Sequence, residues 1–149
     1  MIYLDSSALV KRYVKEEGTE SVEAIVTGSR MMATSRLTYP EVISALTRKQ
    51  RAGEIDAKPY ERALAQFEQD WKRVVVIEFL EEMLPEARAM IQKHALRAGG
   101  TVHLCAAMWT ARSAKLKVQF VSSDRNLLRA AETEELEVVD PSPTAGAPQ

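Results

Sequence analysis

Five short apolar segments, separated by segments with helical patterns, constrain the fold of this chain more than any other feature. They are Met1–Asp5, Met31–Thr34, Val74–Ile77, Val118–Ser122 and Leu136–Val139. Short apolar runs of this kind are typical of strands that are buried on both faces. Strands that alternate with helices favour right-handed crossovers and a mainly parallel sheet. The sequence therefore predicts an α/β fold built on one central sheet of four or five short strands.

Helix signals occupy the segments between these strands. Thr38 and Glu41 have the spacing of a capping box, which predicts a helix that begins at Thr38 and ends near Gly53. The segment after Asp56 carries apolar side chains at helical spacing, which predicts one buried helix face. Its members are Tyr60, Leu64, Phe67 and Trp71. Further helices are expected over about residues 81–96 and 101–115, and a short one after Asp124.

The composition fits one folded domain. The chain has 149 residues, of which 46% are hydrophobic and 28% charged, and this is too apolar for a disordered chain. Cys105 is the single cysteine, which excludes an intramolecular disulfide and a thiolate zinc cage. No apolar run approaches the roughly 20 residues that span a bilayer, and the N-terminus lacks the pattern of a signal peptide. We expect a cytoplasmic domain over residues 1–140, followed by a disordered tail over residues 141–149.

The charges are unevenly distributed along the chain. Eight basic residues lie between Arg88 and Arg129, where Asp124 is the only acid. A basic surface of this kind could bind a polyanion such as RNA. Ordinary solvated helix faces explain the same pattern.

Three acids that are far apart in the sequence follow predicted strands. Asp5 ends the first strand, Glu41 begins the helix after the second, and Asp124 follows Val118–Ser122. In parallel α/β sheets the functional crevice lies beyond the carboxyl ends of the strands. Carboxylates gathered there would bind a hard cation such as Mg²⁺ or Mn²⁺, which activates water and clamps the oxygens of a phosphodiester. The pattern predicts metal-dependent phosphodiester hydrolysis.

Each of these acids also has a structural explanation. Asp5 and Asp124 could be helix N-caps, and Glu41 could complete the capping box. Polar neighbours of the acids are secondary candidates: Ser7 for positioning a ligand or phosphate, and Ser122 and Asn126 for holding metal-bound water. His103 is expected to be a satisfied, partly buried histidine outside the site.

The segments that carry the acids resemble a known family. Residues 1–11, MIYLDSSALVK, resemble the opening of a PIN domain, especially that of the VapC-type toxin nucleases of bacterial toxin–antitoxin pairs. Residues 37–42, LTYPEV, and residues 120–128, FVSSDRNLL, are similar to the segments that carry the second and fourth acids of the family. Residues 96–104, LRAGGTVHL, are similar to the segment of the third acid. The resemblance extends from residue 1 to about residue 140.

The resemblance implies a PIN-like three-layer α/β/α domain and the activity of a Mg²⁺- or Mn²⁺-dependent endoribonuclease toxin. Asp5, Glu41 and Asp124 would be its catalytic and metal-binding residues. It also implies two protein partners. One is a cognate antitoxin whose C-terminal peptide lies over the acidic site, and the other is a second copy of the chain, paired through apolar helix faces.

One position departs from the family pattern, because the third acid is replaced by Gly100. Glycine cannot ligate a metal, so the change should weaken metal affinity and disfavour a second metal. A non-catalytic PIN-like module that binds RNA or a partner protein is therefore the alternative function. A receiver-like or phosphatase-like protein that uses Asp5 is a weaker alternative, because no second acid adjoins Asp5.

Overall fold

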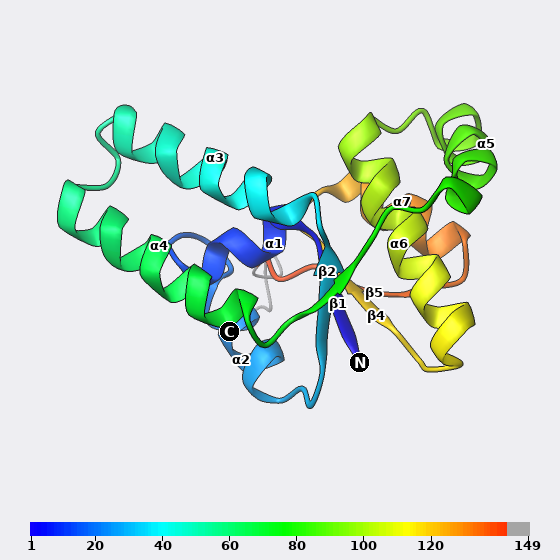
Figure 1. Ribbon diagram of the computed structural model, residues 1–149, viewed down its shortest axis with the longest axis horizontal. Coiled ribbons are helices and arrows are strands. Elements are labelled where there is room, and N and C mark those ends of the chain that lie inside the picture. The colour runs from blue at the N-terminus through cyan, green and yellow to red at the C-terminus, as the bar shows by residue number, and fades with distance from the viewer. Residues whose placement is uncertain (143–149) are drawn as a thin grey trace, which may run out of the picture.

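A computed structural model of the protein describes residues 1–142, in which one parallel sheet lies between two layers of helices (Figure 1). The strands are β1 (Ile2–Leu4), β2 (Met32–Ser35), β3 (Val75–Ile77), β4 (Gln119–Val121) and β5 (Glu137–Val139). Their order in the sheet is β3-β2-β1-β4-β5, and every neighbouring pair is parallel. The predicted α/β class is confirmed, and each of the five apolar segments overlaps a strand, although β2 extends one residue past its predicted segment to Ser35.

The helices form two layers, one on each face of the sheet. Helices that connect β1 to β2 and β2 to β3 form one layer, and those that connect β3 to β4 and β4 to β5 form the other. The first layer holds α1 (Ser6–Leu9), the 3-10 helix η1 (Val10–Arg12), α2 (Thr19–Thr27), α3 (Thr38–Arg51) and α4 (Ala57–Trp71). The second holds the 3-10 helix η2 (Glu81–Met83), α5 (Leu84–His94), α6 (Ala98–Ala114) and α7 (Arg125–Thr133). Of these, α1 is the short helix that an N-cap role for Asp5 implied, whereas α2 was not predicted from the sequence.

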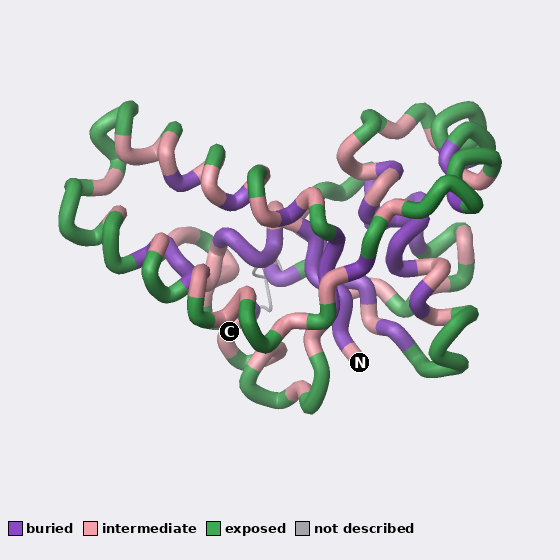
Figure 2. Tube along the Cα trace, viewed as in Figure 1, coloured by how far each residue is buried: buried purple, intermediate pink, exposed green. Residues whose placement is uncertain are grey.

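The alternation of side chains in β1 joins both layers to the sheet. Ile2 and Leu4 are buried in the core beneath α1–α4, whereas Tyr3 points into the core beneath α5–α7. Tyr3 stacks there on Phe120 of β4, with ring centroids 5.6 Å apart. Successive strand residues point to opposite faces, so a strand with helices on both sides is mostly apolar. Figure 2 shows the buried residues along the strands and the inner helix faces, while the far ends of α3 and α4 are largely exposed.

The predicted capping box at the start of α3 is wrong. The N-cap residue is Leu37, and the Glu41 N–H donates to the Leu37 carbonyl oxygen at 3.2 Å rather than to the Thr38 hydroxyl. Thr38 is buried, and its hydroxyl lies 2.6 Å from that of Thr34 in β2. Thr38 thus packs against β2 instead of capping the helix. The Glu41 side chain is not used in a capping box and is available for other partners.

Other helix ends confirm or shift the predictions. Gly53 ends α3 as expected, with φ of +74° and the Glu54 N–H bonded to the Lys49 carbonyl oxygen at 2.9 Å. The helix predicted from residue 101 begins instead at Ala98, so that Gly99 and Gly100 lie in its first turn.

The C-terminal end of the described chain packs against the first layer. Pro141 is buried, and a Cβ added to Gly18, which has φ of +89°, would lie 2.9 Å from the Pro141 carbonyl oxygen. The rest of the tail for which disorder was predicted lies outside the described residues. Among residues 1–142, no helix combines the length and apolar character that crossing a membrane requires.

Candidate active site

The strand order places the predicted acids at the topological switch point of the sheet. The chain runs outward from β1 to β2 and β3, then crosses to β4 and β5 on the other side of β1. Asp5 follows β1 and Asp124 follows β4, which are adjacent parallel strands, while Glu41 lies in the first turn of α3 after β2. The carboxyl ends of adjacent parallel strands meet at one edge of a sheet. The three acids therefore share that edge, as the sequence predicted.

Asp5 is the buried member of the group. Its side chain is only 3% exposed, and it accepts hydrogen bonds from the Ser7 hydroxyl at 2.7 and 2.9 Å and from the Ala8 N–H at 3.0 Å. The Ser122 hydroxyl donates to Asp5 Oδ2 at 2.7 Å. Burial raises the pKa of Asp5, and the nearby His103 and these hydrogen bonds oppose that shift only in part. Asp5 also caps α1, which confirms the structural explanation for this residue, while its role in metal binding stays a prediction.

Ser122 connects Asp5 to Asp124. Its hydroxyl oxygen accepts the Asp124 N–H at 3.0 Å while it donates to Asp5, so one side chain joins the two strand ends. Ser7 makes a similar link, because its hydroxyl oxygen accepts the Ser123 N–H at 3.0 Å. The two serines that the sequence singled out thus hold the β1 and β4 ends together around the buried carboxylate.

Asp124 is exposed and caps α7. Its Oδ1 accepts the backbone N–H groups of Asn126 and Leu127 at 2.9 and 3.2 Å. The Asn126 side chain accepts a hydrogen bond from Arg129 of the same helix. The N-cap explanation for Asp124 is confirmed, yet capping uses only one of its carboxylate oxygens.

Glu41 and Asp124 line the same cleft, which has a volume of about 540 Å³. Its other lining residues are Ala95, Leu96, Arg97, Gly99, Gly100 and Asn126. Asp5 is not among them, because its side chain is buried and hydrogen-bonded to Ser7 and Ser122. Within residues 1–142, no three His, Cys, Asp or Glu side chains are grouped closely enough to hold a metal ion among them. The cleft therefore presents two carboxylates rather than a complete cage.

The two glycines of α6 face different partners across the cleft. A Cβ added to Gly99 would lie 3.6 Å from Glu41 Oε2, whereas one added to Gly100 would lie 3.6 Å from the Leu127 side chain, in the first turn of α7. Both distances are ordinary van der Waals contacts. A Cβ at Gly100, which lines the cleft together with Asp124, would thus fit without displacing its neighbours.

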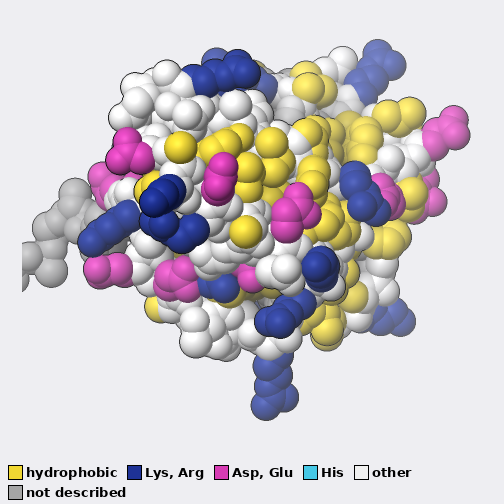
Figure 3. All heavy atoms as spheres, turned by 60° about the vertical axis from the view of Figure 1, so that its left-hand side comes forward, with side chains coloured by type: hydrophobic (Ala, Val, Ile, Leu, Met, Phe, Trp, Pro, Cys, Tyr) yellow, Lys and Arg dark blue, Asp and Glu magenta, His cyan; other side chains and the backbone are white. Residues whose placement is uncertain are grey.

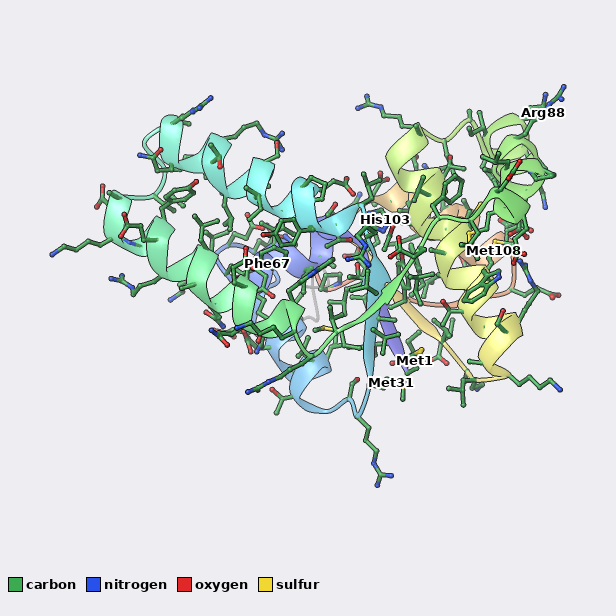
Figure 4. All side chains as sticks on the ribbon, in the orientation of Figure 1. Met1, Met31, Phe67, Arg88, His103 and Met108 are labelled. Carbon is green, nitrogen blue, oxygen red and sulfur yellow. The ribbon has the colours of Figure 1, made fainter. Side chains whose placement is uncertain are left out.

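Two buried residues contact the site although the sequence did not place them there. His103 was expected to lie outside the site, and Tyr3 was not singled out. His103 is 2% exposed, and its Nε2 lies 2.8 Å from Glu41 Oε1. Its Nδ1 lies 3.0 Å from the hydroxyl of Tyr3, whose pKa is raised well above its ordinary value by burial and by the charges of Asp5 and Glu41. Figure 4 places His103 between α6 and the start of α3, near the carboxyl ends of the central strands. The histidine is satisfied, as expected, but its partner is a candidate site residue 62 positions away, which no local pattern indicates.

The raised pKa of Asp5 predicts that the difference in stability between the wild type and an Asp5→Asn variant depends on pH. A folded-state pKa above the unfolded value means that the folded protein binds more protons, so the free energy of unfolding falls as pH rises through that window. An Asp5→Asn variant lacks this contribution. We expect the variant to gain stability relative to the wild type as pH rises above the ordinary aspartate pKa of 3.8. Urea unfolding of both proteins across a pH series in EDTA measures the difference, and a constant difference would contradict the expectation.

Comparisons with known proteins give one family. A model of the PIN domain matches residues 2–133. "Ribonuclease VapC45" of Mycobacterium tuberculosis (strain CDC 1551 / Oshkosh) is 31% identical over 108 residues, which cover 72% of this chain and 75% of that protein.

Solved structures share the fold at low sequence identity. PAE2754 from Pyrobaculum aerophilum superposes with a TM-score of 0.64 at 18% identity, covering 94% of this chain and 88% of that one. A toxin–antitoxin complex from Klebsiella pneumoniae gives a TM-score of 0.61 at 16% identity, covering 95% and 98%. These likenesses support the three-layer architecture.

Proposed function

Because this chain belongs to the PIN domain family, we propose that it is a toxin endoribonuclease that uses a divalent metal to hydrolyse RNA phosphodiester bonds. The observation that carries the proposal is the cleft that Glu41 and Asp124 share at the switch point of the sheet, with the buried Asp5 at the same edge. The similarity to a protein named as a ribonuclease supports RNA as the substrate.

The donor atoms of the cleft fit a hydrated Mg²⁺ or Mn²⁺ ion. Among the described residues, no group donates a hydrogen bond to Glu41 Oε2 or Asp124 Oδ2, so one oxygen of each carboxylate is available. Mg²⁺ is commonly held by one or two carboxylates together with waters and substrate phosphates. Glu41 and Asp124 would bind the ion directly, and Asp5 would add the charge of a third carboxylate. When bound, such an ion lowers the pKa of a coordinated water and offsets charge on the reacting phosphate.

Other residues of the cleft would orient the substrate. Arg97 lines it and offers a positive charge to an RNA phosphate, an interaction that added salt weakens. Ser7 and Ser122 hold the Asp5 carboxylate in place through their hydroxyl groups. Asn126, held by Arg129, lies beside Asp124 and can contact a phosphate oxygen or a bound water.

We further propose that the protein acts in the cytoplasm, pairs with a second copy of itself and binds a cognate antitoxin. The structural likeness to a toxin–antitoxin complex supports the antitoxin. An apolar cavity of about 630 Å³, lined by Leu37, Tyr39, Trp71 and Phe79 among others, suits a protein partner. Figure 3 shows the molecule with the α3–α4 side turned toward the reader. Hydrophobic side chains gather on this face, with basic and acidic side chains interspersed around them. Exposed hydrophobic side chains rimmed by charged ones are typical of surfaces that bind another protein.

Metal removal tests the proposed chemistry. We expect excess EDTA to reduce RNA cleavage by at least about 100-fold and added Mg²⁺ or Mn²⁺ to restore it. The reason is that a bound ion stabilises the charged transition state by several kcal/mol. A fluorescent RNA cleavage assay measures the rate. RNA or antitoxin binding that survives EDTA, without cleavage even after an aspartate is introduced at Gly100, would instead identify the non-catalytic binding module.

A further inference from the structure

A buried chain of hydrogen bonds runs from the core of the sheet to the cleft. It begins at Tyr3 of β1, which is fully buried, passes through His103 of α6, and ends at the Glu41 carboxylate. The Tyr3 ring is fixed by stacking on Phe120 and by edge contact with the His103 ring at 6.0 Å. Only Glu41 reaches the surface, where its side chain is 33% exposed. The chain thus connects the buried core to a partly exposed carboxylate.

For a neutral imidazole, the chemistry of the three groups fixes where the protons lie. A carboxylate can only accept hydrogen bonds, so His103 Nε2 must carry the proton that bonds Glu41 Oε1. In the neutral imidazole Nδ1 then has a lone pair and can only accept. The Tyr3 hydroxyl is therefore the donor to Nδ1 across 3.0 Å, and it selects the tautomer that presents Nε2–H to Glu41.

We infer that His103 is a positioning residue for the proposed metal site, and that Tyr3 acts through it. The hydrogen bond at Oε1 fixes the Glu41 carboxylate so that Oε2 faces the cleft, on the side where Gly99 leaves room. This inference rests on the proposed function, because it assigns His103 a part in metal binding. Partners that orient metal-binding side chains commonly affect metal affinity by about 10- to 100-fold when they are removed.

Mn²⁺ binding to full-length variants tests the role of the hydrogen bond. We expect His103→Met to weaken Mn²⁺ affinity by about tenfold or more, and His103→Gln, whose amide N–H lies at a similar reach, to stay within about threefold of the wild type. In a Glu41→Gln background His103→Met should have no further effect, because the two residues act as one unit. His94→Met is the matched control. His94 also pairs with a glutamate, Glu134 at 2.7 Å, which lies at the opposite end of α7 from Asp124, and its loss should leave the affinity unchanged.

A second measurement needs neither metal nor activity. Nitrogen-15 spectra of histidine-labelled, metal-free protein should show His103 as the Nε2–H tautomer, and a Tyr3→Phe, Glu41→Gln variant, which leaves no partner that fixes the proton, should convert it to a mixture. Thermal unfolding of each variant identifies loss of the fold, which His103→Gln is designed to avoid.

The outcomes separate this inference from the proposed function. A His103 that carries its proton on Nδ1, or unchanged Mn²⁺ affinity in folded His103→Met, overturns the inference alone. A wild type that binds no Mn²⁺ contradicts the proposed function, and the tautomer measurement then decides whether Tyr3 and His103 hold Glu41.

Discussion

Replacing Gly100 with aspartate is expected to raise Mg²⁺-dependent RNA cleavage by about 10- to 100-fold, the largest gain that one substitution should give in this chain. The added carboxylate would enter the cleft beside Asp124 and supply a further oxygen ligand. An added Cβ meets the Leu127 side chain at 3.6 and 3.7 Å, so the site has room. Gly100 is the third residue of α6, where a negative charge is favourable and glycine is a poor helix former.

Two controls define the source of the gain. Gly100→Asn has nearly the same shape without the charge, and it should leave the cleavage rate near that of the wild type. Gly99→Asp adds the same charge one residue earlier, directed at Glu41 Oε2, where repulsion between the carboxylates should limit any gain. Titration calorimetry with Mg²⁺ should show tighter binding in Gly100→Asp only. Equally negligible cleavage by the wild type and Gly100→Asp would argue against a nuclease.

Asp124 allows the catalytic and structural roles of one residue to be separated. In the Gly100→Asp background, Asp124→Asn should reduce cleavage by at least about 100-fold, because it removes a charged metal ligand. The asparagine can still accept the Asn126 and Leu127 N–H groups, so the free energy of unfolding should change by less than about 0.5 kcal/mol. Asp124→Ala should show the same loss of cleavage. Its free energy of unfolding should also fall by about 1 kcal/mol, because the substitution removes the helix cap.

Cleavage rates and urea unfolding of the two variants decide between the roles. Equal activity losses with unequal stabilities support the assignment of Asp124 as a ligand. Retained cleavage in Asp124→Asn would instead show that the residue serves only as the N-cap of α7.

The strands were predictable because their signal is local. A strand covered on both faces is mostly apolar, and Ile2, Tyr3 and Leu4 show this pattern within three residues. The α4 face was predictable for the same reason, since Phe67 is buried and Tyr60, Leu64 and Trp71 pack against the same core. The capping box failed because Thr38 has a partner in β2, Thr34, that the local pattern does not include.

The sequence by itself determined the layered α/β class and the placement of Asp5, Glu41 and Asp124 after strands, because both follow from short-range order along the chain. Only the tertiary structure decided that Asp5 is buried and hydrogen-bonded to Ser122, 117 residues away. It also decided that Glu41 pairs with His103 and that a side chain at Gly100 would approach Leu127. These contacts form between segments that meet only when the sheet assembles and the helices pack against it, so no local spacing encodes them.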